Sequence, residues 1–570
     1  MLPPDFANIP FLRNADKTAL REVTRNAIWY SIPGGTPLFT EGDVADFMWF
    51  VRSGSLGAFR RDSFGQNELI GHIRAGEPVG EMALISGDTH SASVYALRDS
   101  ELFALDKATF NRLVRKYPDL MQGLARTILF RSKQNRRKAA LNNPKVFSFI
   151  SASPTIEIET RAREIVKAIR SLGKSVAIID EQNEAKDASW FDEIERTNDF
   201  VILTSQLGES TWEQTCLRQA DRIWIFGRTD AKPSYPLLPQ NISPVQEFKL
   251  VDVVLVKKVG RNPISSAKEW LNAANATRLL TLREGNESDL KSLARIIVGT
   301  SIGLVLSGGG ARAYAHIGAI RALREAGYDF DFYGGTSMGG VIAACAAMGW
   351  DDREIESHIW DAFVASNPLN DYMLPVVAMT SGKKVETRLK EHFGDVLIED
   401  LIRPYFCVSS NLTEAKVRVH RTGILRQALR ASIALPGILP PVVEDDCVFV
   451  DGAVLNNFPV EIMASLHRGP NIGVDVSRQH ALNAAEFKNP PSFFEWIFKK
   501  GHHSPPPIAE LLMRTATAPL APLKNTHKSD ITIVPDLGDI ELRDWKAFDR
   551  AVEAGYKATV EKLKNSEESF

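Results

Sequence analysis

The chain has 570 residues, of which 44% are hydrophobic and 24% are charged, and its formal net charge at pH 7 is −2. This composition predicts a globular protein of several domains and excludes a strong electrostatic attraction to nucleic acid. The four cysteines form no C-x-x-C pair, so we expect neither a disulfide framework nor a zinc site. We therefore expect a protein that resides in a reducing compartment and binds no metal.

The first residues, MLPPD, contain neither the basic nor the apolar region of a secretory signal. No uncharged apolar stretch reaches the ~18 residues that are needed to span a bilayer. We therefore expect a cytoplasmic protein. Peripheral contact with the inner membrane face stays open.

Residues 29–105 contain many short strand-like runs that glycines interrupt, which predicts a small antiparallel β-barrel or jelly roll. Helical patterns follow at 107–141 and include a basic run at 131–138, which we interpret as a solvated helix face. A first domain with C-terminal helices is therefore placed at residues 1–140.

Residues 80–84, GEMAL, match the G-E-x-A-L cassette of cyclic nucleotide-binding domains, which the barrel resembles. The resemblance implies that Glu81 holds a ribose 2′-hydroxyl and that an arginine ten residues after Gly80 pairs with the cyclic phosphate. This chain has His90 there, an imidazole that is mostly neutral at pH 7. Two roles for the barrel stay open: regulation by a cyclic nucleotide, and docking or dimerisation. Dimerisation would make the protein a homo-oligomer.

The middle of the chain alternates apolar strands with helical patterns. The strands are expected at 146–150, 175–179, 200–204, 222–226 and 250–256. They predict a Rossmann-like α/β connector domain with a parallel sheet, placed at residues 141–300. The GKS at 173–175 lacks the earlier glycine of a phosphate loop, since position 168 is alanine, and it follows a helix instead of opening one. We expect a helix C-cap there.

Three motifs in residues 301–570 carry the predicted chemistry. In the first, an apolar strand at 302–306 leads into Gly308, Gly309 and Gly310, and helical spacing follows at 311–326. Glycines let backbone amides point into such a loop, and a helix N-terminus adds partial positive charge. These amides are predicted to form an oxyanion hole.

The second motif, Gly335 to Gly339, lies between an expected strand at 331–335 and an expected helix at 341–348. Its two glycines relieve the crowding of a sharp elbow that presents Ser337 as the nucleophile. The third motif places Asp451 after an apolar run at 447–450. In open α/β sheets the carboxyl ends of strands are where ligands bind, so we expect Asp451 at that edge.

In this order the three motifs resemble the patatin-like phospholipases, whose signature is a glycine-rich loop, a G-x-S-x-G elbow and a D-G-G/A motif. The resemblance implies a Ser337–Asp451 dyad and an oxyanion hole at the glycine loop, with Arg312 holding that loop. Ala313 departs from the family, which usually has glycine there. Because an ordinary aspartate is a poor base at neutral pH, burial must raise the pKa of Asp451.

A serine, acid and histidine triad is the alternative mechanism, because five histidines follow Asp451 in the chain: His467, His480, His502, His503 and His527. The glycine loop and the D-G-A context favour the dyad. With a dyad, single His→Ala changes leave turnover within about tenfold. His316, in the helix after the glycine loop, is expected to be a packing residue.

Residues 210–222 resemble neuropathy target esterase, a patatin-like lysophospholipase that also has cyclic-nucleotide-like domains, and the domain order extends this resemblance over most of the chain. Eukaryotic members have an N-terminal transmembrane helix and several nucleotide-like domains. This sequence shows no such helix and one such domain, so we expect a compact, bacterial-style relative.

The resemblance implies a patatin-type α/β hydrolase domain at 301–570, with its core motifs at 303–465 and a C-terminal extension. Its expected substrates are phospholipids or lysophospholipids, with lysophospholipids favoured. A catalytically silent signalling or scaffold protein is the competing hypothesis.

An aromatic segment, SFFEWIFKK at 492–500, lies in the C-terminal extension. It is predicted either to sit in a membrane interface or to pack over the mouth of the active site.

Overall fold

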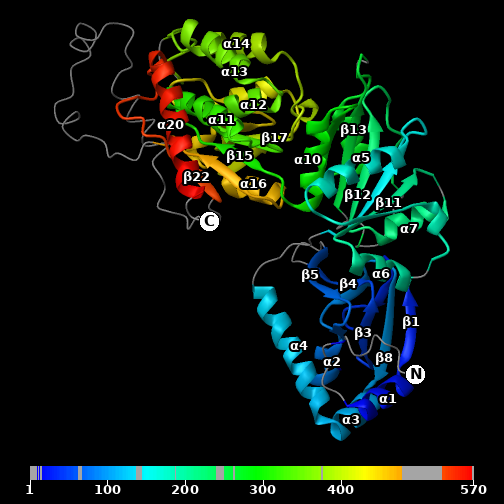
Figure 1. Ribbon diagram of the computed structural model, residues 1–570. Helices are drawn as coiled ribbons and strands as arrows, with labels where there is room; N and C mark the ends of the chain where they lie inside the picture. The colour runs from blue at the N-terminus through cyan, green and yellow to red at the C-terminus, as the bar shows by residue number, and fades with distance from the viewer. Residues whose placement is uncertain are drawn as a thin grey trace, which may run out of the picture. The chain divides into compact units, whose positions relative to one another are not determined.

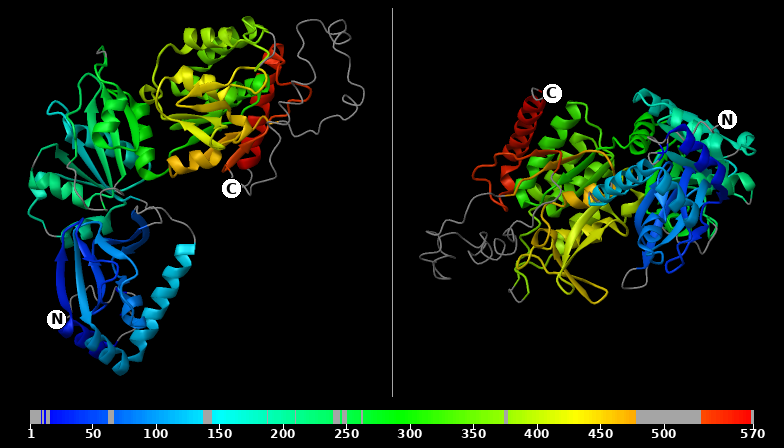
Figure 2. Two further views of the ribbon diagram at one scale, coloured as in Figure 1. Left: turned by 180° about the vertical axis from the view of Figure 1, so that it is seen from behind. Right: turned by 90° about the horizontal axis from the view of Figure 1, so that it is seen from below.

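The protein forms two compact units, Met1–Ser265 with Glu269–Lys291, and Ser266–Lys268 with Ser292–Phe570. Figures 1 and 2 show a computed structural model of the chain. It describes residues 16–61, 67–136, 144–186, 188–208, 210–238, 250–260, 263–373, 377–477 and 529–567, together with 9, 12 and 245. The segment at 492–500 lies outside these residues.

The first unit begins with the predicted barrel domain, which consists of two facing four-stranded antiparallel sheets. The strand orders are β1-β8-β3-β6 and β2-β7-β4-β5. The strands are β1 (Ile28–Ile32), β2 (Pro37–Phe39), β3 (Phe47–Ser53), β4 (Ser55–Arg61), β5 (Asn67–Arg74), β6 (Pro78–Val79), β7 (Ser93–Ala96) and β8 (Ser100–Asp106). Apolar side chains such as Val51, Leu56 and Leu102 alternate inward and fill the space between the sheets.

Helices cover the outer face of the β1-β8-β3-β6 sheet. They are α1 (Lys17–Asn26), α3 (Lys107–Lys116) and α4 (Pro118–Arg136), while α2 (Glu81–Ser86) carries the cassette. Phe50 and Phe103 stack at 4.8 Å on this face and pack against Phe110 and Leu113 of α3. Burial of these aromatic rings fixes the helices to the barrel.

The connector domain follows in the same unit and has a wholly parallel sheet, as predicted. Its strand order is β10-β11-β9-β12-β13-β14. The strands are β9 (Val146–Ser151), β10 (Val176–Ile179), β11 (Phe200–Gln206), β12 (Arg222–Arg228), β13 (Leu250–Lys257) and β14 (Arg278–Arg283). The connecting helices are α5 (Ile158–Ser171), α6 (Ala188–Thr197), α7 (Thr211–Gln219), α9 (Ala267–Ala274) and α10 (Glu287–Val298).

Two local features of the connector bear on its sequence. The sixth strand, β14, was not expected from the pattern, because only two of its six residues are buried. The GKS at 173–175 lies at a helix C-terminus, where Gly173 has φ +75° and follows the end of α5. Lys174 faces Asp199, and Ser175 Oγ donates to the same carboxylate at 2.9 Å. This segment is therefore a helix cap, as predicted.

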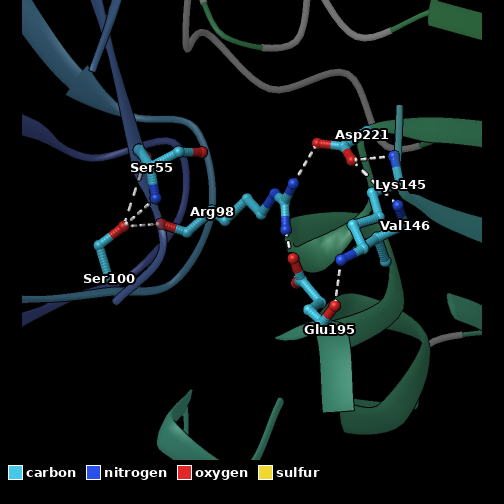
Figure 3. Close-up of polar contacts among 7 residues, drawn as sticks. All are labelled: Ser55, Arg98, Ser100, Lys145, Val146, Glu195 and Asp221. Carbon is cyan, nitrogen blue, oxygen red and sulfur yellow. Dashed lines mark hydrogen bonds and ion pairs between the residues drawn. The ribbon is translucent and has the colours of Figure 1, made fainter. Parts of the chain in front are cut away.

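Arg98, in the loop between β7 and β8, joins the barrel to the connector (Figure 3). Its guanidinium donates to Glu195 Oε1 at 2.6 Å and to Asp221 Oδ1, and its side chain is 13% exposed. Asp221 Oδ2 also accepts the backbone amide of Lys145 at 2.7 Å. One mostly buried cation thus links a barrel loop to the start of the connector sheet.

The second unit is built on a mostly parallel sheet of order β19-β20-β17-β16-β15-β21-β22, with β18 also paired to β17. The strands are β15 (Gly303–Leu306), β16 (Phe332–Thr336), β17 (Tyr405–Asn411), β18 (Lys416–His420), β19 (Val442–Glu444), β20 (Cys447–Asp451), β21 (Asn471–Val474) and β22 (Ile531–Ile533). The three central strands, β15, β16 and β17, are fully buried, which explains their continuous apolar or glycine-rich runs.

Helices pack on both faces of this sheet (Figure 1). They are α11 (Ala315–Glu325), α12 (Ser337–Ala347), α13 (Asp352–Ile359), α14 (Lys383–Phe393), α15 (Leu425–Ser432), α16 (Val460–Leu466) and α20 (Phe548–Glu567). The last of these lies against α11, and a Cβ added to Gly318 would stand 1.8 Å from the Val552 carbonyl. The C-terminal helix is therefore part of the core of the second unit. Among the described helices, none is long and apolar enough to cross a membrane.

Candidate active site

The nucleophile elbow lies between β16 and α12. Ser337 is the first residue of α12 and has φ +53°, a left-handed conformation that is strained for a residue with a side chain. The helix thus begins four residues earlier than the sequence pattern predicts. The Ser337 amide donates to Ser432 Oγ at 3.0 Å, and Ser432 Oγ donates to the Val408 carbonyl at 2.7 Å. These bonds hold the strained turn against β17.

The glycine at position 339 is required by a close approach of α12 to β15. A Cβ on Gly339 would lie 2.3 Å from the Ser307 carbonyl oxygen, and a Cβ on Gly335 would lie 2.7 Å from the Leu306 carbonyl oxygen. Any side chain at either position would force the elbow away from the glycine loop. The two glycines therefore set the distance between the nucleophile and that loop.

Asp451 reaches the nucleophile by a route other than the predicted one. Its strand, β20, runs antiparallel to β17, so the rule for the carboxyl ends of parallel strands does not place it. Instead β17 extends beyond β16: Thr336 pairs with Val408, and Asp451 pairs with the next residue, Ser409. The extension of β17 thus brings the acid directly beside the elbow.

The two side chains form a direct hydrogen bond. Ser337 Oγ donates to Asp451 Oδ2 at 2.7 Å, and the Ala453 amide donates to Asp451 Oδ1 at 2.9 Å. Asp451 is 0% exposed and Ser337 is 4% exposed. Burial raises the pKa of Asp451 to about 7, against the opposing effect of the two hydrogen bonds. A carboxylate with this pKa can accept a proton from serine near neutral pH.

The backbone groups of the glycine loop show which amides are available to an oxyanion. The Gly308 amide donates to the Asn457 carbonyl at 3.1 Å, and the Ala311 amide donates to the Leu542 carbonyl at 2.8 Å. The inclusion of Gly308 among the oxyanion donors is therefore corrected. Among the described residues, the amides of Gly309 and Gly310 have no acceptor. They directly follow Gly308, whose Cβ position would lie 3.2 Å from Ser337 Cβ.

Arg312 and His316 fix the glycine loop through hydrogen bonds to backbone carbonyls. Arg312 Nε donates to the Val476 carbonyl at 2.9 Å, and its Nη1 donates to the Ile540 carbonyl at 3.1 Å. Its guanidinium therefore anchors the loop and does not belong to the oxyanion hole itself. His316 Nε2 lies 2.8 Å from the Ser307 carbonyl, and burial lowers the pKa of His316 to about 4. The ring is neutral and donates to that carbonyl. Ala313, the departure from the family pattern, is fully buried beside Arg312.

No described histidine contacts the dyad. Because Ser337 Oγ bonds directly to Asp451, an intervening imidazole has no place between them. His467 lies at the amino end of β15, where it bonds to Ser301 Oγ at 3.1 Å and stacks on Phe332. The other four candidates, His480, His502, His503 and His527, fall outside the described residues. The described part of the chain also contains no cluster of acidic, histidine or cysteine side chains that could hold a metal ion.

The barrel cassette has a neutral aromatic ring at the position where a phosphate site would have a cation. Gly80, with φ +81°, caps α2, and Glu81 is buried at its first turn. His90 is 6% exposed and stacks on Phe39 with 3.7 Å between ring centroids. Burial lowers the pKa of His90, so its ring is neutral at pH 7. The cassette residues therefore do not fit a cyclic phosphate, because this position offers no charge to the anion.

The sequence did not single out Asn457 or Ser432, which contact the glycine loop and the elbow. Asn457 is one of two asparagines in a turn before Pro459, and asparagine in a turn is common. Ser432 ends a short helix whose other buried residues are mostly apolar. No local pattern distinguishes either residue from its neighbours.

Sequence profiles of three families match this chain. The patatin-like phospholipase profile matches residues 304–464, the cyclic nucleotide-binding domain profile matches 30–117, and the neuropathy target esterase family P-loop-like domain profile matches 158–278. The chain contains a patatin-like phospholipase domain. It has the domain set of the neuropathy target esterase group, and the patatin domain identifies it as a lipid hydrolase. The P-loop-like domain of this patatin-like protein has no glycine or lysine between β9 and α5.

Relatives align along nearly the whole chain. An uncharacterised NTE family protein of Mycobacterium tuberculosis is 28% identical over 97% of this chain and 94% of its own length. Patatin-like phospholipase domain-containing protein 6 of Mus musculus is 26% identical over 93% of this chain and 44% of its own length. The patatin-like chain thus spans less than half of that mammalian protein. The catabolite activator protein of Thermus thermophilus is 24% identical over 29% of this chain and 70% of that structure, with a TM-score of 0.21.

Proposed function

We propose that this protein hydrolyses acyl ester bonds of lysophospholipids, and of phospholipids more broadly, through a Ser337–Asp451 dyad. The observation that carries the proposal is the 2.7 Å hydrogen bond from Ser337 Oγ to a buried carboxylate whose pKa is raised to about 7. A strained serine, a base of suitable pKa and two amides without an acceptor among the described residues together support acyl transfer. The proposal includes a cytoplasmic protein that meets its lipid at the inner membrane face.

The first half of the proposed reaction forms an acyl-enzyme. Ser337 Oγ attacks the ester carbonyl carbon while Asp451 takes the hydroxyl proton. The carbonyl oxygen becomes an oxyanion and accepts hydrogen bonds from the amides of Gly309 and Gly310. The tetrahedral species then breaks its bond to the glycerol oxygen, which leaves with the proton from Asp451. No metal takes part in the proposal.

In the second half, water replaces the alcohol. Asp451 takes a proton from the water as it attacks the acyl carbonyl, and the same two amides hold the second oxyanion. The bond to Ser337 Oγ then breaks, and the serine regains a proton from Asp451. The fatty acid leaves and the dyad returns to its starting state.

The decisive experiment measures fatty-acid release from lysophosphatidylcholine by the purified protein and by Ser337→Ala. Release by the wild type that falls by at least about a thousandfold in the variant supports the proposal. Equal release by both proteins would contradict the role of Ser337. The scaffold hypothesis predicts no labelling of the wild type by a fluorophosphonate, which requires an activated serine.

For the barrel we propose a structural role in place of cyclic nucleotide regulation. Support comes from His90, which is neutral, buried and stacked on Phe39 where the related domains have a charged arginine. A bidentate guanidinium is the group that matches a phosphate, and an imidazole in this state supplies neither its charge nor its second donor.

A further inference from the structure

We infer that Asn457 is a positioning residue for the oxyanion hole, and that it acts by fixing Gly308, the residue before the amides of Gly309 and Gly310. This inference rests on the proposed ester hydrolysis at Ser337. The residue holds Gly308 from both sides. Its backbone carbonyl accepts the Gly308 amide at 3.1 Å, and its side-chain Nδ2 donates to the Gly308 carbonyl at 3.2 Å.

Asn457 and the residue before it contact two further parts of the site. Nδ2 of Asn457 also donates to Ser477 Oγ at 2.9 Å, which ties the loop to the end of the β21 segment. Next to it, the Asn456 carbonyl accepts the Thr336 hydroxyl at 3.0 Å, directly before the nucleophile. The six residues after Asp451 therefore connect the acid, the nucleophile strand and the glycine loop.

The packing around Gly308 leaves the loop little freedom while Asn457 is present. A Cβ added to Gly308 would lie 2.5 Å from Asn457 Oδ1 and 3.2 Å from Ser337 Cβ. The amide group of Asn457 thus borders Gly308 on the side where the nucleophile also lies. Without this amide group, the Gly308 carbonyl would lose the hydrogen bond from Asn457 Nδ2, and the peptide would have room to rotate.

The side chain also carries a feature that a purely stabilising residue would not have. Asn457 Oδ1 is buried and has no hydrogen-bond partner among the described residues. A buried acceptor without a partner lowers the stability of the fold. The unpaired Oδ1 of Asn457 therefore costs some stability, while its Nδ2 fixes the glycine loop.

Rotation of the Gly308 peptide would shift the amides of Gly309 and Gly310. Oxyanion donors act only when they already point at the place where charge develops, so a small displacement weakens them in the transition state. Substrate binding in the ground state uses the lipid chain and headgroup and depends less on these amides. Loss of Asn457 should therefore lower kcat and leave KM nearly unchanged.

The test compares Asn457→Ala and Asn457→Asp with a matched control, Asn198→Ala. The aspartate keeps the volume of the side chain, and its ionised carboxylate cannot donate to the Gly308 carbonyl. The control removes the same type of side chain from the connector domain, where Asn198 Nδ2 donates to the Ile194 carbonyl at 3.0 Å. Measurements are kcat and KM on a short-chain p-nitrophenyl ester, the rate of Ser337 modification by a fluorophosphonate, and thermal unfolding.

Both Asn457 variants are expected to lose about tenfold to a hundredfold in kcat, somewhat less than removal of an oxyanion donor itself, with KM within about twofold. The fluorophosphonate rate should fall in parallel, because its phosphoryl oxygen occupies the same hole. Asn198→Ala should stay within about twofold of the wild type in kcat, KM and the fluorophosphonate rate.

An active wild type whose Asn457 variants match Asn198→Ala in kcat would overturn the inference. A loss confined to KM, or one seen in Asn457→Ala but absent from Asn457→Asp, would also overturn it, since the donor would then be irrelevant. A wild type that neither hydrolyses the ester nor reacts with the fluorophosphonate would instead overturn the proposed function, and the inference with it.

Discussion

Ser337 and Asp451 are 114 positions apart in sequence, and their side chains meet in a direct 2.7 Å hydrogen bond within the core of the catalytic unit. The carboxylate is fully buried, so its charged form is disfavoured and the pKa of Asp451 rises to about 7. Activity and stability should therefore both respond to the ionisation of this one group.

The first prediction concerns the pH dependence of activity. Asp451 must be ionised to take the serine proton, so kcat/KM should rise about tenfold per pH unit below pH 7 and level off above it. A pH–rate profile on a p-nitrophenyl ester measures this directly. A profile that is flat from pH 5 to 9 would contradict Asp451 as the base.

The second prediction concerns stability. Because the pKa of Asp451 is raised in the folded protein, the folded state holds a proton between about pH 4 and 7 that the unfolded chain has released. Its contribution to stability is therefore present below about pH 4 and is lost as the pH rises through about 7. Asp451→Asn has no ionisable group at this position and therefore no such loss. Its free energy of unfolding should exceed that of the wild type by an amount that grows with pH and approaches about 4 kcal/mol above pH 7.

Denaturant unfolding of both proteins at pH 4.5 and pH 8.5 checks this expectation. Asp451→Asn should be inactive at both values and more stable than the wild type chiefly at pH 8.5. Equal stability differences at the two pH values would mean that the carboxylate ionises as it does in water.

The third prediction concerns the contact between the glycine loop and the elbow. In Gly308→Ala the new Cβ would lie 2.5 Å from Asn457 Oδ1, so the loop must move away from Ser337. We expect a loss of about a hundredfold or more in kcat, as for removal of an oxyanion donor. Gly208→Ala is the control, because its Cβ would meet no atom within 4 Å. Similar activity in the two variants would show that the loop tolerates the displacement.

The fourth prediction concerns Arg98. Arg98→Met leaves Glu195 and Asp221 without their shared cation, and burial already raises the pKa of Glu195. The three side chains are 13–21% exposed, so removal of one partner should destabilise the first unit by up to about 3–5 kcal/mol, the loss found for a fully buried pair. Adding Glu195→Gln and Asp221→Asn to Arg98→Met should recover much of this loss, because the remaining charges are then gone.

Thermal unfolding of these variants can be compared with Arg163→Met. Arg163 pairs with Glu159 on the surface, where the two side chains are 68% and 51% exposed. Surface pairs of this kind contribute little, so this variant should unfold within about 1–2 °C of the wild type. An equally small effect of Arg98→Met would show that the barrel and the connector do not depend on that cluster.

The fifth prediction concerns the barrel cassette. The wild type should show no saturable binding of cyclic AMP in calorimetry at concentrations up to about 0.1 mM, because position 90 has no cation for the phosphate. In His90→Arg, a guanidinium at this position should add a charged hydrogen bond and raise affinity by at least about tenfold. Tight binding by the wild type would contradict the structural role proposed for the barrel.

The sequence by itself predicted the antiparallel barrel, the parallel connector sheet and the hydrolase motifs. These features depend on local signals: glycine-interrupted strands, alternating strands and helices, and an elbow whose glycines flank one serine. The same local reasoning recognised the GKS at 173–175 as a helix cap. It missed β14, whose alternating exposure resembles neither a buried run nor a helix.

How these parts cooperate depends on contacts between distant segments of the folded chain. The place of Asp451 depends on β17 extending past β16 so that an antiparallel strand can pair beside the elbow, and no short stretch of sequence contains that register. The proposed oxyanion donors are Gly309 and Gly310, and not Gly308, because the Gly308 amide already donates to the Asn457 carbonyl. The ion pairs of Arg98 likewise depend on carboxylates more than ninety residues away. Local sequence determines which chemical groups are present. Long-range packing determines which of them are left unpaired, buried or charged, because those states depend on neighbours that only the folded chain brings together.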